Sequence, residues 1–250
     1  MSTPDRDRGP APFVPWPLQW RPEQVVRFWD WRSRNLALEH QYYSKRLGDD
    51  LFRYLRGVFA LRGVLLDLGC GPGHLVDKAL AEGMEVRAID SSPESVAALN
   101  QRLAGARGFH GALLGQVGQV PMPDESGDVV AVIETVEHLD DAQLGDLLKE
   151  AWRLTRRGGH VVITTPNEEP LGELEVMCPS CGCVFHQYQH VRSFSSASLR
   201  GLMEAQGFAT RRCHALLLSF LPRWMRPFHR WVYPRVKGRL PHLVYVGQRP

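Results

Sequence analysis

The chain has 250 residues, of which 44% are hydrophobic and 23% are charged, and its formal net charge is +3. That length suffices for one large α/β domain with a full core, and the composition is that of an ordinary globular protein. No apolar run reaches eighteen residues, which excludes a membrane-spanning helix. Residues 1–12 are polar, lack the apolar segment of a secretory signal and are expected to be disordered, so we expect a cytoplasmic protein.

Residues 13–60 are rich in aromatic side chains and in residues that favour helices. We expect two or three helices here, which form an N-terminal helical cap on the main domain. Two roles are open for this cap. It either completes the core by ordinary packing, or it forms a lid over a ligand site with Tyr42 or Tyr43 facing that site.

Residues 64–76 are the most informative part of the chain. An apolar run at 64–66 ends at Asp67, and three glycines then alternate with other residues before an apolar-periodic segment begins. This order predicts a buried strand, a tight turn and the start of a helix. Glycines allow a close approach of the backbone to a ligand, and the free N–H groups of the helix start favour a polar or anionic group.

Alternating strands and helices follow this motif to the end of the chain. The expected strands are 64–67, 85–90, 109–114, 128–134, 160–165, 209–214 and 243–247, and the expected helices are 74–81, 92–103, 140–154 and 196–206. Such alternation predicts an α/β fold with a doubly wound, mostly parallel, seven-strand Rossmann-like sheet over residues 61–250. Ligands of such sheets bind beyond the carboxyl ends of the strands.

The spacing Asp67-x-Gly69-x-Gly71-x-Gly73 resembles the first motif of the class I S-adenosylmethionine (SAM) dependent methyltransferases. Further motifs in the same order extend the resemblance over about residues 60–215 and the last strand. The resemblance implies that Asp67 holds the methionine ammonium and that the backbone from Gly69 through Cys70 and Gly71 to Gly73 passes beneath the cofactor.

The resemblance also implies how the rest of the cofactor is held. Asp90, at the end of the second strand, would accept both ribose hydroxyls, with Ser91 beside it. Gln116 stands where the family usually has an aspartate that accepts a hydrogen bond from the adenine amino group. A glutamine carbonyl can accept the same bond.

Residues 134–138, Glu-Thr-Val-Glu-His, close the strand expected at 128–134. His138 is a candidate base for the methyl acceptor, oriented by Glu134 or Glu137. With His190, these side chains also form a set that suits a divalent cation. The pattern is similar to RNA 3′-terminal 2′-O-methyltransferases and to quinone-biosynthesis O-methyltransferases. Alternatively, Glu134 only lines the cofactor site, Glu137 is solvated and His138 caps the turn.

A zinc-knuckle-like insertion is expected at residues 168–194, where 178–183 read Cys-Pro-Ser-Cys-Gly-Cys. In a cytosolic chain this pattern indicates a metal before a disulfide. The simplest structural zinc set is Cys178, Cys181, His186 and His190, with Cys183 as a substitute. Buried reduced thiols and a redox pair are the alternatives. His190 cannot easily serve both this site and the set around His138.

The chain has no acidic residue after Glu204, and residues 216–240 mix arginines with aromatic and aliphatic side chains. This segment suits the inner surface of an anionic membrane or a lipid-phosphate substrate better than nucleic acid, or else it is a cover over the sheet edge. The resemblance thus implies SAM-dependent O-methylation of a small-molecule or lipid-linked anionic acceptor. An RNA 3′-terminal 2′-O-methyltransferase and a non-catalytic SAM-binding or zinc interaction module are the alternatives.

Overall fold

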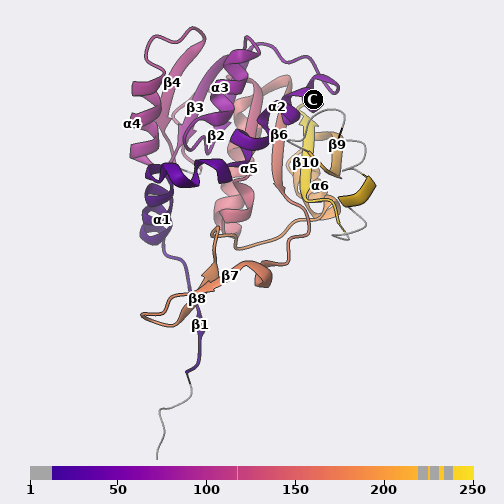
Figure 1. The fold of residues 1–250 in the computed structure, drawn as a ribbon. Coiled ribbons are helices and arrows are strands. Elements are labelled where there is room, and N and C mark those ends of the chain that lie inside the picture. The colour runs from indigo at the N-terminus through magenta and orange to yellow at the C-terminus, as the bar shows by residue number, and fades with distance from the viewer. Residues whose placement is uncertain (1–12, 117, 219–224, 226–230, 234–238) are drawn as a thin grey trace, which may run out of the picture.

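The computed structural model describes residues 13–116, 118–218, 225, 231–233 and 239–250 (Figure 1). The tail expected at 1–12 and most of the basic aromatic segment at 216–240 lie outside the described residues. No helix in the described ranges is long and apolar enough to cross a membrane.

A seven-stranded sheet forms the centre of the molecule, in the order β4-β3-β2-β5-β6-β10-β9. Its strands are β2 (Val64–Leu68), β3 (Glu85–Asp90), β4 (Phe109–Leu114), β5 (Gly127–Ile133), β6 (Thr155–Pro166), β9 (Ala209–Leu216) and β10 (His242–Gln248). Of these seven strands, β10 alone runs opposite to the other six. The predicted α/β fold with a mostly parallel seven-strand sheet is therefore confirmed. Strand β6 begins earlier than predicted, because Thr155 pairs with Gly127 before a register shift.

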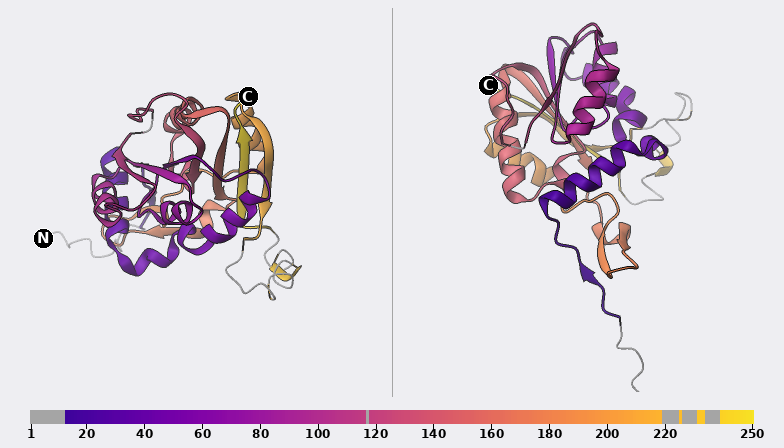
Figure 2. Two further views of the ribbon diagram at one scale, coloured as in Figure 1. Left: turned by 90° about the horizontal axis from the view of Figure 1, so that it is seen from above. Right: turned by 90° about the vertical axis from the view of Figure 1, so that its left-hand side faces the viewer.

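Helices cover both faces of the sheet (Figures 1 and 2). Helices α5 (Asp141–Leu154) and α6 (Ser196–Ala205) pack on one face with β5 and β6. Helices α2 (Tyr43–Arg56), α3 (His74–Ala81) and α4 (Pro93–Arg102) pack on the other. Parallel strands covered on both faces are buried throughout, which explains their continuous apolar sequences.

The segment expected as a helical cap contains α1 (Pro22–Arg34), the 3₁₀ helix η1 (Leu36–Gln41) and α2. Three side chains of α2, Leu51, Phe52 and Leu55, belong to the main core and are at most 3% exposed. Helix α1 instead lies across the end of the domain beside a small second sheet (Figure 2). Helix α2 thus contributes to the core of the main domain.

The small second sheet was not predicted. It has three short strands in the order β1-β8-β7, namely β1 (Trp16–Pro17), β7 (Glu175–Met177) and β8 (Cys183–His186), and the 3₁₀ helix η3 (Leu171–Leu174) precedes it. It projects from the main body in Figure 1. The N-terminal segment thereby pairs in parallel with the insertion.

Gly73 shows why the turn after β2 needs glycine. Its φ is +84°, and an added Cβ would lie 2.4 Å from Cδ1 of Leu99. Left-handed strain and the clash together should make Gly73→Ala destabilising by about 2–4 kcal/mol. Gly83 is the matched control, because its φ is +79° and nothing lies within 4 Å of an added Cβ. Urea unfolding should give Gly83→Ala only the strain, about 1 kcal/mol. Equal losses for both variants would rule out the Leu99 contact as the cause.

Candidate active site

The loop between β2 and α3 carries the first group of predicted cofactor residues. The backbone N–H groups of Gly69 and Cys70 both donate to the carbonyl of Ile89, at 2.8 and 3.1 Å, which fixes the loop against β3. Asp67 is 2% exposed, and burial, together with the nearby Asp90, raises its pKa to about 8. Its Oδ2 has no hydrogen-bond partner within the described residues. An orphaned acid beside a glycine turn fits a cationic or hydroxylic ligand.

Asp90 lies at the end of β3, as the resemblance implies. Its two carboxylate oxygens accept backbone N–H groups of Gly71 at 2.7 Å and Ser92 at 2.8 Å. A carboxylate can accept about four hydrogen bonds, so ribose hydroxyls can still bind. Ser91 is exposed, and Ser92 rather than Ser91 caps α4. Gln116 is exposed on the turn after β4, where its backbone carbonyl accepts a hydrogen bond from the backbone N–H of Gln119.

Both tyrosines considered for the lid lie at this site. The ring of Tyr42 is the side chain nearest Gly71, with Cε1 3.9 Å from the position of an added Cβ. Burial raises the pKa of Tyr43 well above its ordinary value, and Glu134 adds to this effect. Tyr42 therefore lies beside the glycine loop after β2, and Tyr43 lies near the end of β5.

Glu134 and Glu137 follow β5, at the edge where the other parallel strands also end. Glu134 has φ +49°, and burial raises its pKa to about 7. Glu137 is only 1% exposed, and burial raises its pKa well above the ordinary value. Neither oxygen of Glu137 has a hydrogen-bond partner in the described part of the chain. An ionised carboxylate in this place requires a cation or a donor to compensate for its lost hydration.

His138 and His190 adjoin Glu137. The ligand atoms of the three residues lie within 4.8 Å of one another. Nδ1 of His138 is 3.4 Å from the carbonyl oxygen of Gln189, so Nδ1 carries the proton and Nε2 keeps its lone pair. Nε2 lies 4.0 Å from Oε1 of Glu137. Burial, with His190 close by, lowers the pKa of His138 to about 3, which makes it a poor general base and a suitable neutral ligand.

Glu169 orients His190 from the other side. It accepts the Nδ1 proton of His190, which leaves Nε2 of that ring as the nitrogen with a lone pair. A carboxylate that holds the far nitrogen of a ligating histidine is a recurrent feature of metal sites. Glu169 follows the strand β6, so the arrangement draws together the ends of β5 and β6 and the insertion.

His186 has the opposite protonation. Its Nδ1 accepts backbone N–H groups of Tyr188 at 3.3 Å and His190 at 3.2 Å, so the proton is on Nε2. That Nε2 faces Oε1 of Glu169 at 3.8 Å. With the Nδ1 lone pair taken by two N–H groups, the proton lies on Nε2, which has no hydrogen-bond partner within the described residues. In this state His186 offers no lone pair to a metal, and it lies beside Glu169 without a hydrogen bond to it.

The structure does not bring together the predicted zinc set of Cys178, Cys181, His186 and His190. Among the described residues, the thiols of Cys178, Cys181 and Cys183 form one group, and the two histidines form another with Glu169. Extended strand β8 separates the groups, because Cys183 is its first residue and His186 its last. Backbone N–H groups of Cys181 and Ser180 lower the pKa of Cys178.

Trp29 and Gln189 are site residues that the sequence did not indicate. Gln189 is 1% exposed. Its side-chain amide donates to the carbonyl of His138 and its side-chain oxygen accepts the indole N–H of Trp29, both at 3.0 Å. The next residue of α1, Asp30, accepts a hydrogen bond from the hydroxyl of Ser92 at 2.7 Å, next to Asp90. Helix α1 therefore touches both ends of the site.

Strained backbone conformations are also concentrated at the candidate site. Four described non-glycine residues have positive φ, and three of them flank the acid and histidine group, namely Glu134, Glu168 and Gln189. Such conformations cost about 1–3 kcal/mol each and cluster at functional sites.

Asp67, the glycine turn and Asp90 together fit SAM, since they offer an unpartnered buried acid, a close backbone and a second acid one strand away.

Comparison with known proteins agrees with this geometry. A family profile described as a methyltransferase domain matches residues 16–212. A probable SAM-dependent methyltransferase of Mycolicibacterium smegmatis is 30% identical over 173 residues, which are 69% of this chain and 62% of that protein. A ubiquinone biosynthesis O-methyltransferase of Pseudomonas putida is 31% identical over 108 residues, 42% of this chain and 45% of that protein. The matches thus span about half to three fifths of each relative.

A solved structure with a similar fold is the Burkholderia thailandensis 1,6-didemethyltoxoflavin-N1-methyltransferase with bound 1,6-didemethyltoxoflavin and S-adenosylhomocysteine. Its TM-score is 0.61 at 19% identity, and the alignment covers 94% of this chain and 93% of that one. This likeness concerns the fold. The family profile, which covers well over half of the chain, concerns descent as well, and this chain therefore belongs to the methyltransferase domain family.

Proposed function

We propose that the protein is a SAM-dependent O-methyltransferase whose acceptor hydroxyl binds beside a divalent cation held by Glu137, His138 and His190. The observation that carries this proposal is the buried, unpartnered carboxylate of Glu137 next to His138 and His190, whose Nδ1 contacts leave each Nε2 with a lone pair. Two neutral imidazoles and one carboxylate suit a divalent ion and leave coordination positions for an acceptor.

The chain's own residues would hold the two reactants in line. SAM supplies the methyl group on a sulfonium that is already a good leaving group, so alignment and proton removal are what the protein must add. Asp67 and Asp90 hold the cofactor at the ends of β2 and β3. Glu134 lies at the end of the adjacent strand β5 with an unpartnered Oε1, which suits it to accept the hydroxyl proton.

The cation site fits the residues present for the reasons given above, and Glu169 and His186 complete it as positioning residues. A divalent ion bound there would lower the pKa of an acceptor hydroxyl and fix its position. The Pseudomonas putida relative is named as an O-methyltransferase, which agrees with a hydroxyl acceptor.

An open cleft lined by His40, Gln41, Arg46 and Tyr188 lies between the cap and the insertion. The ring centre of Tyr188 is 5.9 Å from that of His190, so the cleft leads toward the cation site. Arginine and histidine in this lining favour an anionic acceptor, either a free small molecule or one linked to a lipid.

The test uses protein from which bound cations have been removed with a chelator, together with isotopically labelled SAM. The acceptors are a panel of phenolic, catecholic and lipid-linked hydroxy acids. Turnover should require added Mg²⁺, Mn²⁺ or Zn²⁺, whereas SAM binding measured by calorimetry should survive chelation. Turnover that is equal with and without chelator would refute the cation. Methylation confined to nitrogen or carbon acceptors would refute the O-methyl assignment.

The same cation site favours one second candidate, an RNA 3′-terminal 2′-O-methyltransferase, because terminal ribose hydroxyls can also be held by a cation. Cation-dependent methylation of a short RNA that is abolished by oxidising its 3′-terminal diol would select this candidate over a small-molecule acceptor.

A further inference from the structure

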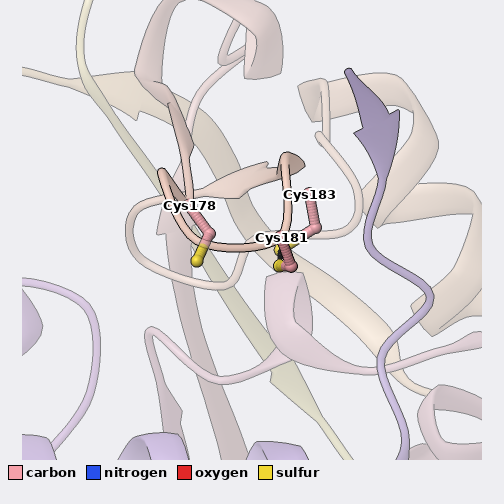
Figure 3. A group of neighbouring side chains, drawn as sticks. All are labelled: Cys178, Cys181 and Cys183. Carbon is pink, nitrogen blue, oxygen red and sulfur yellow. Dashed lines mark hydrogen bonds between the residues drawn. The ribbon is translucent and has the colours of Figure 1, made fainter. Parts of the chain in front are cut away.

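The three cysteines of the insertion form a cluster separate from the cation site. Their sulfurs lie within 4.8 Å of one another, and those of Cys181 and Cys183 are 3.4 Å apart. Figure 3 shows the three side chains on one short loop, with Cys178 on one side of it and the other two close together. All three are free thiols, and a disulfide would bring two sulfurs to about 2.05 Å.

The loop that carries the cysteines is preshaped. The N–H of Cys178 donates to the carbonyl of Cys183, and the N–H of Gly182 donates to the carbonyl of Cys178, both at 2.8 Å. Gly182 has φ +76°, and an added Cβ would lie 2.6 Å from the ring of Phe13. The backbone of the turn therefore holds the three cysteines on one short loop, from which their sulfurs reach one another.

Within the described residues, the small sheet around this loop buries little apolar surface between its own strands, and Phe185 of β8 packs against Trp20 outside the sheet. All three residues of β7 are exposed, and so are several large apolar side chains of the sheet and the segment before it, namely Phe13, Val14, Trp16, Val176 and Met177. A unit of strands two to four residues long buries too little apolar surface to offset its conformational entropy. Small units of this kind commonly depend on a metal or another cross-link.

We propose that Cys178, Cys181 and Cys183 bind one Zn²⁺ as a structural cross-link, without His186 or His190, and that the exposed side of Cys181 leaves the fourth coordination position to solvent. The site is distinct from the cation site of the proposed function and does not depend on it. Three thiolates select a soft ion, whereas the carboxylate and imidazoles near Glu137 suit a harder one.

The cross-link would extend to the N-terminal segment. The indole N–H of Trp16 donates to the carbonyl of Cys181 at 3.0 Å, and the N–H of Leu18 donates to the carbonyl of Val184 at 2.8 Å. Strand β1 therefore lies against the loop that carries the three cysteines. Helix α1, which supplies Trp29 to the candidate site, follows β1 in the chain. The metal would fix the position from which α1 starts.

Cobalt titration of the reduced full-length protein tests the proposal, because Co²⁺ replaces Zn²⁺ and gives a charge-transfer band only with thiolate ligands. One equivalent should develop the band in the wild type and in His186→Ala and His138→Ala. Cys183→Ser and Cys178→Ser should lose it or weaken Co²⁺ binding by more than about 100-fold. The matched control is Cys213→Ser, which alters a buried thiol on β9 and should keep the band.

Circular dichroism establishes that each variant is folded, and Cys178→Ser, at a less buried position, covers the case in which Cys183→Ser does not fold. No thiolate band in the reduced wild type would overturn the proposal. A band lost in His186→Ala as fully as in Cys183→Ser would overturn the three-cysteine set. Neither result bears on the cation site, which is read by chelator-sensitive turnover.

Discussion

Asp67→Asn is expected to weaken SAM binding about 100-fold and, at the same time, to raise the melting temperature of the ligand-free protein at alkaline pH. The first effect follows because the variant loses a charged hydrogen-bond acceptor for the methionine ammonium, worth about 1.5–3 kcal/mol. The second follows from the burial of the acid, whose pKa rises from 3.8 to about 8 on folding.

The sign of the pH effect is fixed by linkage. A folded pKa above the unfolded value means that the folded state holds the proton more tightly, so the acid stabilises the fold fully only below pH 3.8 and this stability is lost as the pH rises to about 8. At 1.36 kcal/mol per pKa unit the full loss is about 6 kcal/mol, roughly half of it between pH 6 and pH 9. The asparagine has no such loss, so we expect its advantage to be greater at pH 9 than at pH 6, by about 5 °C.

Asp49→Asn is the matched control, because Asp49 is 72% exposed in its pair with Lys78. It should change neither SAM affinity nor stability by more than about 0.5 kcal/mol. Isothermal titration calorimetry gives the SAM affinities, and differential scanning calorimetry gives the melting temperatures. Unchanged SAM affinity in Asp67→Asn would mean that the acid does not contact the cofactor, and an advantage independent of pH would mean that its burial is not the cause.

Glu137→Gln and His138→Ala should each lower cation-dependent turnover by about 10²–10⁴-fold while SAM affinity stays within twofold. In the proposed function both side chains lie at the acceptor end of the site, and neither is among the residues proposed to hold the cofactor. Glu137→Gln has a second readout, because it removes an unpartnered buried carboxyl. Without cation, the variant should be at least as stable as the wild type.

Two exposed residues that pair with each other, Glu85 and His110, supply the matched controls. Glu85→Gln and His110→Ala should leave turnover, cation affinity and SAM affinity unchanged. A Glu137→Gln enzyme that still requires the cation and binds it with wild-type affinity would exclude Glu137 as a ligand. His186→Gln is expected to be milder, about 10–100-fold, because it acts through Glu169.

The features predicted correctly from the sequence are those set by local order. Asp67 and its glycines lie within one strand, turn and helix, and Asp90 follows one β-α unit later, so the chain itself nearly fixes their separation. The mostly parallel sheet follows from the same alternation. His138 and His190, 52 positions apart, are brought together with Glu137 through hydrogen bonds from the insertion to the loop after β5, whereas Glu134, the fourth member of the predicted set, lies outside this group.

The grouping of the candidate metal ligands was harder to predict because spacing does not reveal which side chains an extended segment separates. A spacing of four residues would place His186 and His190 on one face of a helix, but His186 ends a strand and the chain then reverses through Gln189 at φ +61°. The parallel pairing of Trp16 with Cys183 joins segments 167 residues apart. It has no sequence signature in a strand of two residues, and the small sheet could not have been predicted.

Helix α1 contacts both halves of the candidate site, through the hydrogen bond of Asp30 with Ser92 beside Asp90 and through that of Trp29 with Gln189 beside His138. A displacement of this helix would therefore break a contact in each half. If SAM and a cation bind as proposed, any coupling through α1 is reciprocal, and the retained SAM affinity expected of Glu137→Gln means that this coupling is small.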